Sequence, residues 1–128
     1  QAYRAQLQGR AQYAGELSAA MQAALEAARA AEEAAGAAAT EAGIQEGALE
    51  AAREDVRRLQ GELDALDPCD PAHAAKQAEL ASARQALQQA QGRFDAASNA
   101  LNEAVALLDL RLAQLDEQDE SLRAFNKG

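Results

Sequence analysis

Large aromatic side chains, cysteine and proline are all scarce in this chain of 128 residues. It has no tryptophan, two tyrosines, two phenylalanines, one cysteine and two prolines. A single cysteine excludes an intrachain disulfide framework and a cysteine-based metal cage. The apolar content of 48% is mostly alanine, which cannot fill a globular core of ordinary thickness but suits long helices packed closely together. We therefore expect one all-α domain.

Basic residues are also few, with 12 Lys and Arg against 21 Asp and Glu, so the formal net charge is −9. Binding to nucleic acid or to anionic lipid headgroups requires a basic face, and this balance argues against both. No stretch approaches the ~18 consecutive apolar residues of a membrane span, and the start of the chain does not resemble a signal peptide. We expect this chain, as given, to be soluble.

Catalytic motifs are missing as well. His73 is the only histidine, and we expect it to be an exposed residue of a turn rather than a base or a metal ligand. Cys69 is expected to be an incidental exposed thiol. Phosphate-binding glycine loops, nucleophile elbows and clusters of metal ligands are not found. The sequence predicts no enzyme activity, no cofactor and no metal.

Both prolines lie in one short stretch, and this stretch organises the chain. Pro68 cannot continue a helix and keeps Asp67 out of the α region. Asp70 and Pro71 then provide an N-cap and a first helical residue. We expect a helix over about 2–66, a tip at 67–71 and a second helix over about 72–125. The predicted fold is a long antiparallel coiled-coil hairpin.

A seven-residue apolar repeat runs along both predicted helices, which is the pattern of a left-handed coiled coil. In the first helix the repeat falls on Tyr3, Leu7, Arg10, Ala14, Leu17, Met21, Ala24, Ala28, Ala31, Ala35, Ala38, Ala42, Gln45, Leu49, Ala52, Val56, Leu59, Leu63 and Leu66. In the second helix it falls on Leu80, Ala83, Leu87, Ala90, Phe94, Ala97, Leu101, Ala104, Leu108, Arg111, Leu115, Gln118, Leu122 and Phe125. Folding about the tip pairs residues whose numbers add to roughly 139, so that large side chains mostly meet small ones.

Two features leave room for a third short helix beside the hairpin. Glycines could bend the first helix near Gly9–Gly15, or soften it over Gly36–Gly47, where a continuous helix is favoured. Apolar side chains near Val105, Leu107, Leu110 and Leu112 form a band wider than a two-stranded seam can cover. A third helix of the same protein, or a partner, could cover this band.

The tip and its flanking heptads resemble the N-terminal coiled-coil region of the SipB/IpaB-type translocators of type III secretion. In that family a long helix ends in an L-D-P-x-D-P turn and a second long helix returns. The matching run here is Leu63-Asp64-Ala65-Leu66-Asp67-Pro68-Cys69-Asp70-Pro71. An aromatic at Tyr3, large apolar residues at Leu17 and Met21, and the segment 122–128 are also similar. Cys69 replaces a small residue, and Ala35 and Leu49 replace mid-helix aromatics.

The resemblance implies a secreted protein at the needle tip on the bacterial surface. Such a protein then inserts segments C-terminal to this region into the host cell membrane as part of the translocon pore. The implied partners are other translocators, needle-tip proteins, further copies of the chain and a secretion chaperone that binds upstream. The expected contact residues are Val105, Leu107, Leu110, Leu112, Tyr3, Leu7 and Tyr13, with Asp67, Pro68, Asp70 and Pro71 forming the tip.

Other classes of protein also use such hairpins. One alternative is the hairpin of a periplasmic membrane-fusion protein, which predicts flanking β-rich segments. Another is a stand-alone export-ATPase stalk of the FliJ/YscO kind, which is cytoplasmic and more highly charged. A membrane-active toxin rod is disfavoured by the charge and by the lack of an apolar span. The doubled Asp-Pro tip is not a mark of stalks of the FliJ/YscO kind.

Overall fold

The computed structural model describes the backbone of residues 2–127 and the side chains of residue 10 and residues 12–127. Two helices, α1 (Ala2–Asp64) and α2 (Pro71–Lys127), account for this part of the chain apart from the tip between them, and it contains no strand. The predicted all-α hairpin is confirmed. The predicted helix ends lie within two residues of those observed.

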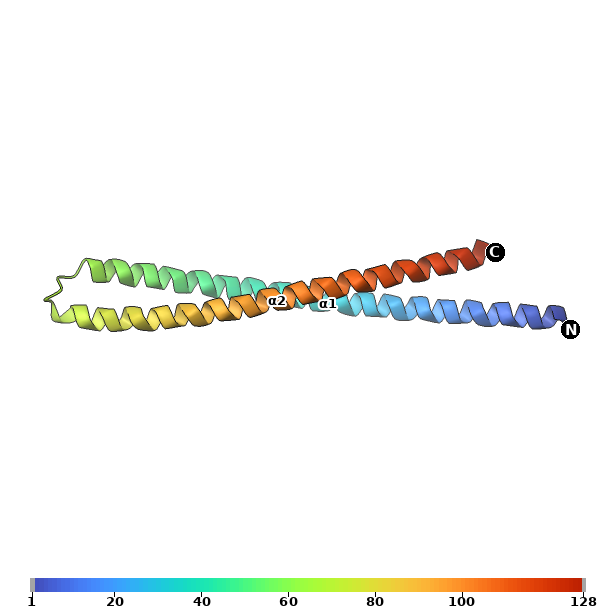
Figure 1. Cartoon of the computed structure of the whole chain (residues 1–128), viewed down its shortest axis with the longest axis horizontal. Coiled ribbons are helices and arrows are strands. Elements are labelled where there is room, and N and C mark those ends of the chain that lie inside the picture. Colours follow the sequence, from blue (N-terminus) through green and yellow to red (C-terminus); the bar gives the residue numbers. More distant parts are fainter. Residues whose placement is uncertain (1, 128) are drawn as a thin grey trace. The chain divides into compact units, whose positions relative to one another are not determined.

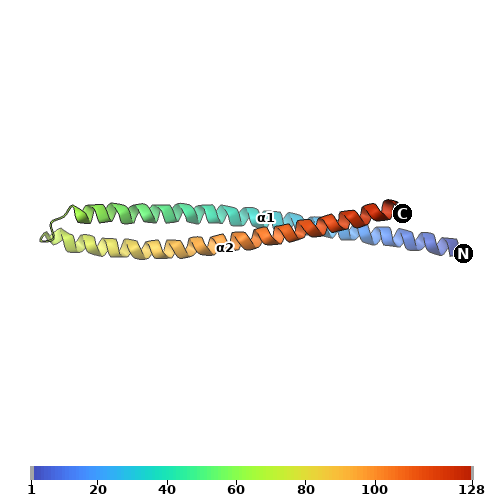
Figure 2. The same ribbon diagram turned by 45° about the horizontal axis from the view of Figure 1, so that its top comes forward.

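Chain contacts divide the protein into two compact units. Unit 1 combines Gln1–Gly36 with Asn102–Gly128, and unit 2 is the continuous segment Ala37–Leu101, which contains the tip. In unit 2 the end of α1 and the start of α2 lie side by side in both views (Figure 1, Figure 2). Unit 1 also takes one segment from each helix. The expectation of a single domain stays a prediction.

The end of α1 is closed by backbone hydrogen bonds and by an aspartate. The amide of Ala65 donates to the carbonyl of Gly61 at 3.2 Å, and Leu66 donates to Leu63 at 3.0 Å. These bonds satisfy carbonyl groups that a helix end leaves open. Asp67 then folds the tip, because its Oδ1 accepts a hydrogen bond from the amide of Cys69 at 2.9 Å.

The start of α2 has the N-cap that the sequence predicts. Asp70 Oδ1 accepts a hydrogen bond from the amide of Ala72 at 2.9 Å, which satisfies one of the free amides of the first turn. Pro71 follows as the first helical residue, where its missing amide costs nothing. The carbonyl of Asp70 accepts from the amide of His73 at 2.9 Å and begins the helical ladder.

This cap gives a first prediction. Asp70→Ala should lower the free energy of unfolding of unit 2 by about 1 kcal/mol, because the amide of Ala72 would lose its side-chain acceptor. Asp70→Ser keeps an acceptor at the same position and should lie close to the wild type. Urea unfolding followed by circular dichroism measures both variants. Equal stability of Asp70→Ala and the wild type would contradict the assignment of Asp70 as the cap.

The predicted heptad positions form the seam between the helices. From Ala14 to Leu66 and from Leu80 to Phe125, each of these positions is buried or half-buried. The most deeply buried side chains are Leu17, Ala28, Ala31, Ala35, Ala42, Leu49, Leu59, Leu80, Ala90 and Ala97. No polar side chain of the described residues is fully buried. Burial of these mostly small residues lets the two helices approach closely in each unit.

The register agrees with the predicted pairing about the tip. In unit 1 the rings of Tyr13 and Phe125 are in contact, and in unit 2 Glu62 binds Lys76. In both pairs the residue numbers add to 138, one less than the expected 139.

The glycines do not bend or interrupt α1. The helix is continuous through Gly9–Gly15 and Gly36–Gly47, and no described glycine has a positive φ. The continuous helix favoured over Gly36–Gly47 is confirmed. A short N-terminal helix that folds back is not found within residues 2–127, so no third helix of this part of the chain covers the apolar band of α2.

Candidate interaction surfaces

The four predicted contact residues of α2 are large apolar side chains left open in unit 1. Val105, Leu107, Leu110 and Leu112 are between 42% and 52% exposed. At 100° per residue, Val105 and Leu112 share one side of α2, while Leu107 and Leu110 share the opposite side. The single wide band inferred from the sequence is therefore two separate strips, one on each flank of the seam.

The strip with Leu107 borders an open groove between the helices of unit 1. The lining residues are Ala27, Ala30, Ala31, Ala34, Leu107 and Arg111. The alanines come from one side of α1, and the two longer side chains come from α2. Because alanine has no atoms beyond Cβ, the α1 side of this groove is low and α2 provides its wall.

Arg111 is a cation in the seam and in the wall of the groove. It is half-buried, and its Nη1 donates a hydrogen bond to Gln114 Oε1 at 2.9 Å. Among the described side chains, no carboxylate forms an ion pair with it. A guanidinium has five N–H donors, so Arg111 retains capacity for an acceptor brought by another molecule.

The opposite strip continues onto α1. Leu25 is exposed and directly follows the seam residue Ala24. The register of the hairpin places Leu25 across the seam from Leu112. Sequence reasoning missed both Leu25 and the exposed Ile44 of unit 2. Their signal was available, since each is a large apolar residue beside a heptad position rather than at one.

Of the three predicted contact residues near the N-terminus, only Tyr13 has a described side chain. Tyr3 and Leu7 lie outside the residues whose side chains are described. The ring of Tyr13 is half exposed and meets Phe125 edge-on, with ring centres 5.3 Å apart and planes at 65°. The guanidinium of Arg10 lies 5.5 Å from the centre of the same Phe125 ring. Tyr13 therefore has a partner within unit 1, and only part of its ring is available to another molecule.

The tip residues Asp67, Pro68, Asp70 and Pro71 are all exposed, and both aspartates hold backbone amides. The thiol of Cys69 is free and exposed, as expected. His73 differs from the expectation, because it is half-buried in the first turn of α2 rather than exposed. It lies seven residues before Leu80 and so occupies an additional position of the seam.

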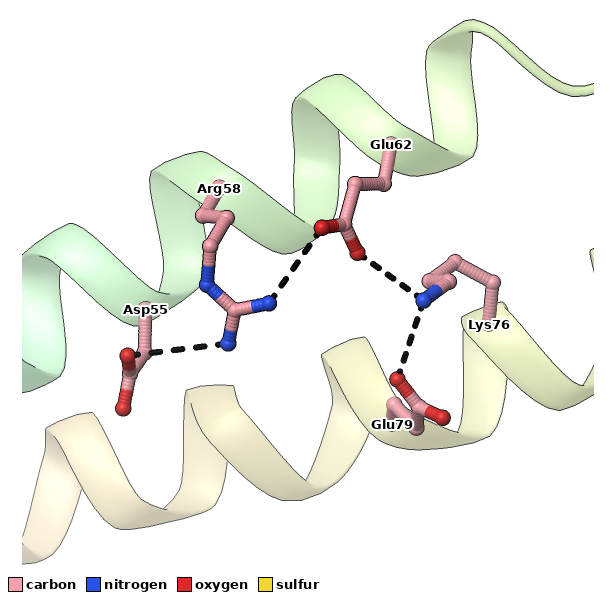
Figure 3. Close-up of polar contacts among 5 residues, drawn as sticks. All are labelled: Asp55, Arg58, Glu62, Lys76 and Glu79. Atoms are coloured by element: carbon pink, nitrogen blue, oxygen red, sulfur yellow. Dashed lines mark hydrogen bonds and ion pairs between the residues drawn. The ribbon is translucent and has the colours of Figure 1, made fainter.

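A chain of ion pairs connects the helices beside the tip (Figure 3). Lys76 Nζ lies 2.9 Å from Glu62 Oε2 across the seam and 3.2 Å from Glu79 Oε2 on α2. Arg58 extends the chain along α1 to Glu62 at 3.3 Å and to Asp55 at 3.7 Å. Sequence reasoning missed this network, although Lys76 stands one heptad step before Leu80.

Two further hydrogen bonds cross between the helices of unit 2. Arg84 Nη2 donates to Gln60 Oε1 at 2.8 Å, and Arg53 Nη2 donates to Gln91 Oε1 at 3.5 Å. The polar side chains that flank the seam thus bridge the helices in unit 2.

The ion pairs shift the pKa values of both partners. The hydrogen bond from Lys76, assisted by its charge and by Arg58, holds the pKa of Glu62 below the ordinary 4.5. Hydrogen bonds to Glu62 and Glu79 raise the pKa of Lys76 above 10.5. The contribution of Glu62 is therefore present above pH 4.5 and lost as the pH falls through its folded pKa. That of Lys76 is present below pH 10.5 and lost as the pH rises through its folded pKa.

A carboxyl NMR titration tests this pairing. The pKa of Glu62 should lie below 4.5 in the wild type and move back toward it in Lys76→Met, which keeps most of the length of the side chain but removes its charge. Lys127→Met, a change in unit 1, should leave the pKa of Glu62 unchanged. An ordinary pKa for Glu62 in the wild type would show that the pair does not persist in solution.

No group of three His, Cys, Asp or Glu side chains among the described residues is arranged to hold a metal ion. Neither α1 nor α2, over the residues described, is apolar enough along its length to cross a membrane.

The exposed strips and the groove can offer another protein apolar packing surface and one guanidinium. Comparison of the chain with protein-family models, curated proteins and solved structures finds no match.

Proposed function

We propose that this chain is a non-enzymatic interaction domain of a secreted type III translocator of the SipB/IpaB type. In this proposal the full protein acts at the needle tip and helps to form the translocon pore in the host membrane through segments outside this chain. Its partners are other translocators, needle-tip proteins and a chaperone that binds upstream. The observation that carries the interaction role is the set of four exposed aliphatic side chains of α2 in unit 1.

The energetics of these four side chains favour a contact surface. Complete burial of a valine or leucine side chain contributes roughly 1.5–3 kcal/mol, and each of these is less than two-thirds buried already. Covering the two strips, one on each flank, would therefore contribute several kcal/mol to association in total. Singly exposed apolar residues are common on protein surfaces, whereas here each flank of the seam carries two that lie on the same side of α2.

The tip supports the family part of the proposal. Its two aspartates each bind a backbone amide two residues ahead, at Cys69 and at Ala72. Each aspartate is followed by a proline, which fixes the backbone where one helix has ended and the other begins. The doubled Asp-Pro therefore has a structural use in this chain, and it is the element on which the resemblance to the translocators is based.

Charged substitutions on the two strips test the interaction role. Leu107→Glu and Leu112→Glu should each weaken binding to the needle-tip and translocator proteins of the proposed secretion system at least tenfold, because a carboxylate would be buried in the contact. Ala19→Glu, on an exposed position of α1 in the same unit, should bind as the wild type does. Sedimentation or calorimetry with the purified partners gives the affinities.

Circular dichroism distinguishes loss of a contact from loss of the fold. We expect both leucine variants to keep the helicity and melting behaviour of the wild type. If either variant melts like an unfolded chain, that leucine belongs to the core of unit 1 and the assignment is wrong. Unchanged binding by both variants would also contradict it.

A further inference from the structure

The groove of unit 1 is lined on its α1 side by small side chains. Ala27, Ala30 and Ala34 recur at three- and four-residue spacing, so they form one row on α1. Leu107 lines the opposite wall, and Leu110 lies on the same side of α2. A helix placed here could approach the small side chains of α1 while its own large side chains fill the space beside Leu107.

Arg111 indicates the chemistry of that helix. Arg53, Arg57, Arg58 and Arg123 each form an ion pair with a carboxylate, whereas Arg29, Arg84 and Arg93 form none among the described side chains but are exposed. Arg111 lines the groove, is half-buried and binds the neutral Gln114 instead. Arg111 thus lacks a carboxylate partner among the described side chains, although the chain has 21 acidic residues against 12 basic ones. A carboxylate of another molecule could accept a charge-assisted hydrogen bond from the guanidinium of Arg111.

The charges around the groove disfavour a second copy of this chain as the occupant. Each copy carries a net charge of −9, so two copies repel one another. Glu103 and Glu117 stand seven residues before and after Leu110, in the same row of α2 and exposed. A two-fold contact centred on Leu110 would bring Glu103 of one copy against Glu117 of the other. A different protein with cations at these points would be attracted.

We propose that this groove binds an amphipathic α-helix of a different protein, with leucines in the groove, a carboxylate on Arg111 and basic residues facing Glu103 and Glu117. The inference rests on the proposed function, because it specifies the partner of one of the contact strips. Specificity would come from the single acidic position, since the apolar packing alone accepts many helices.

A synthetic helical peptide provides the probe. It has three heptads with leucine at two positions of each, lysine on the remaining faces and one central glutamate beside the leucine row. A matched peptide has glutamine in place of this glutamate. Fluorescence anisotropy at physiological salt should show that Ala30→Glu weakens binding of the acidic peptide at least tenfold. Ala19→Glu adds the same charge on an exposed position outside the groove and should leave binding within twofold.

Arg111→Gln tests the charge contact. This substitution should weaken binding of the acidic peptide about tenfold and binding of the glutamine peptide less than twofold. Glutamine is tolerated in the seam, where Gln45 and Gln118 already stand. Ala30→Glu changes only an exposed position of α1, so the groove can still be tested if Arg111→Gln fails to fold.

Three results would overturn the inference. The first is that the acidic peptide does not bind, and the second is that it binds equally to Ala30→Glu and the wild type. The third is concentration-dependent dimerisation of the chain that Ala30→Glu abolishes, which would make a second copy the occupant. If Leu112→Glu loses its natural partners while Ala30→Glu keeps them, the proposed function survives and the groove inference fails.

Discussion

Leu49→Ala is expected to lower the free energy of unfolding of unit 2 by about 2–4 kcal/mol. Leu49 is the most buried large side chain of the described residues, at 2% exposed. The register places it opposite Ala90, which is itself buried and too small to fill the space that the leucine would leave. The loss therefore combines the transfer of a leucine side chain from water with an unfilled cavity.

Ile44→Ala is the matched control for this substitution. Ile44 lies on the same helix and in the same unit, but it is 59% exposed. Its replacement should change the stability by less than about 0.5 kcal/mol, because little packing is removed and alanine favours the helix. Urea unfolding at neutral pH measures both variants. A similar loss for the two would show that the seam does not have the register described.

The variant carrying Gly43→Ala, Gly47→Ala, Gly61→Ala and Gly92→Ala is expected to be more stable than the wild type by about 2–4 kcal/mol. Each position is helical in unit 2, and an added Cβ at any of them meets no other atom within 4 Å. None has a positive φ. Alanine would therefore reduce the freedom of the unfolded chain without straining the folded one.

The melting temperature and the urea midpoint of this fourfold variant should both rise. Because none of these positions lies in unit 1, its affinity for the helical peptide and for the partner proteins should stay unchanged. A variant no more stable than the wild type would mean that these positions are not helical in solution. Single substitutions would then identify which part of α1 or α2 departs from the helix.

The hairpin could be predicted because its signals are local. Pro68, Asp70 and Pro71 stop one helix and start the next within a few residues, and this holds whatever the rest of the chain does. The heptad repeat likewise identifies the seam from spacing alone. Even Arg111, which departs from the apolar pattern, lies half-buried where the repeat places it.

The surfaces could be predicted only in part, because they depend on how two helices meet. Sequence spacing showed that the segment from Val105 to Leu112 has more large apolar residues than the seam can bury. It predicted that these residues form one band. Their division into two strips follows from the positions of individual residues around α2 relative to the seam. The pair of Glu62 with Lys76 joins side chains fourteen residues apart on different helices, so no local spacing indicates it. His73 was expected to be exposed, although the repeat, extended back from Leu80, includes it.

The coding sequence on both sides of this chain is the most direct test of the proposed function. A translocator should continue, C-terminal to this chain in the same reading frame, into two strongly apolar stretches of at least ~18 residues each. These would be the segments that enter the host membrane. A reading frame that ends soon after residue 128 would contradict the proposal in favour of a self-contained stalk. A β-rich continuation would contradict it in favour of the hairpin of a membrane-fusion protein.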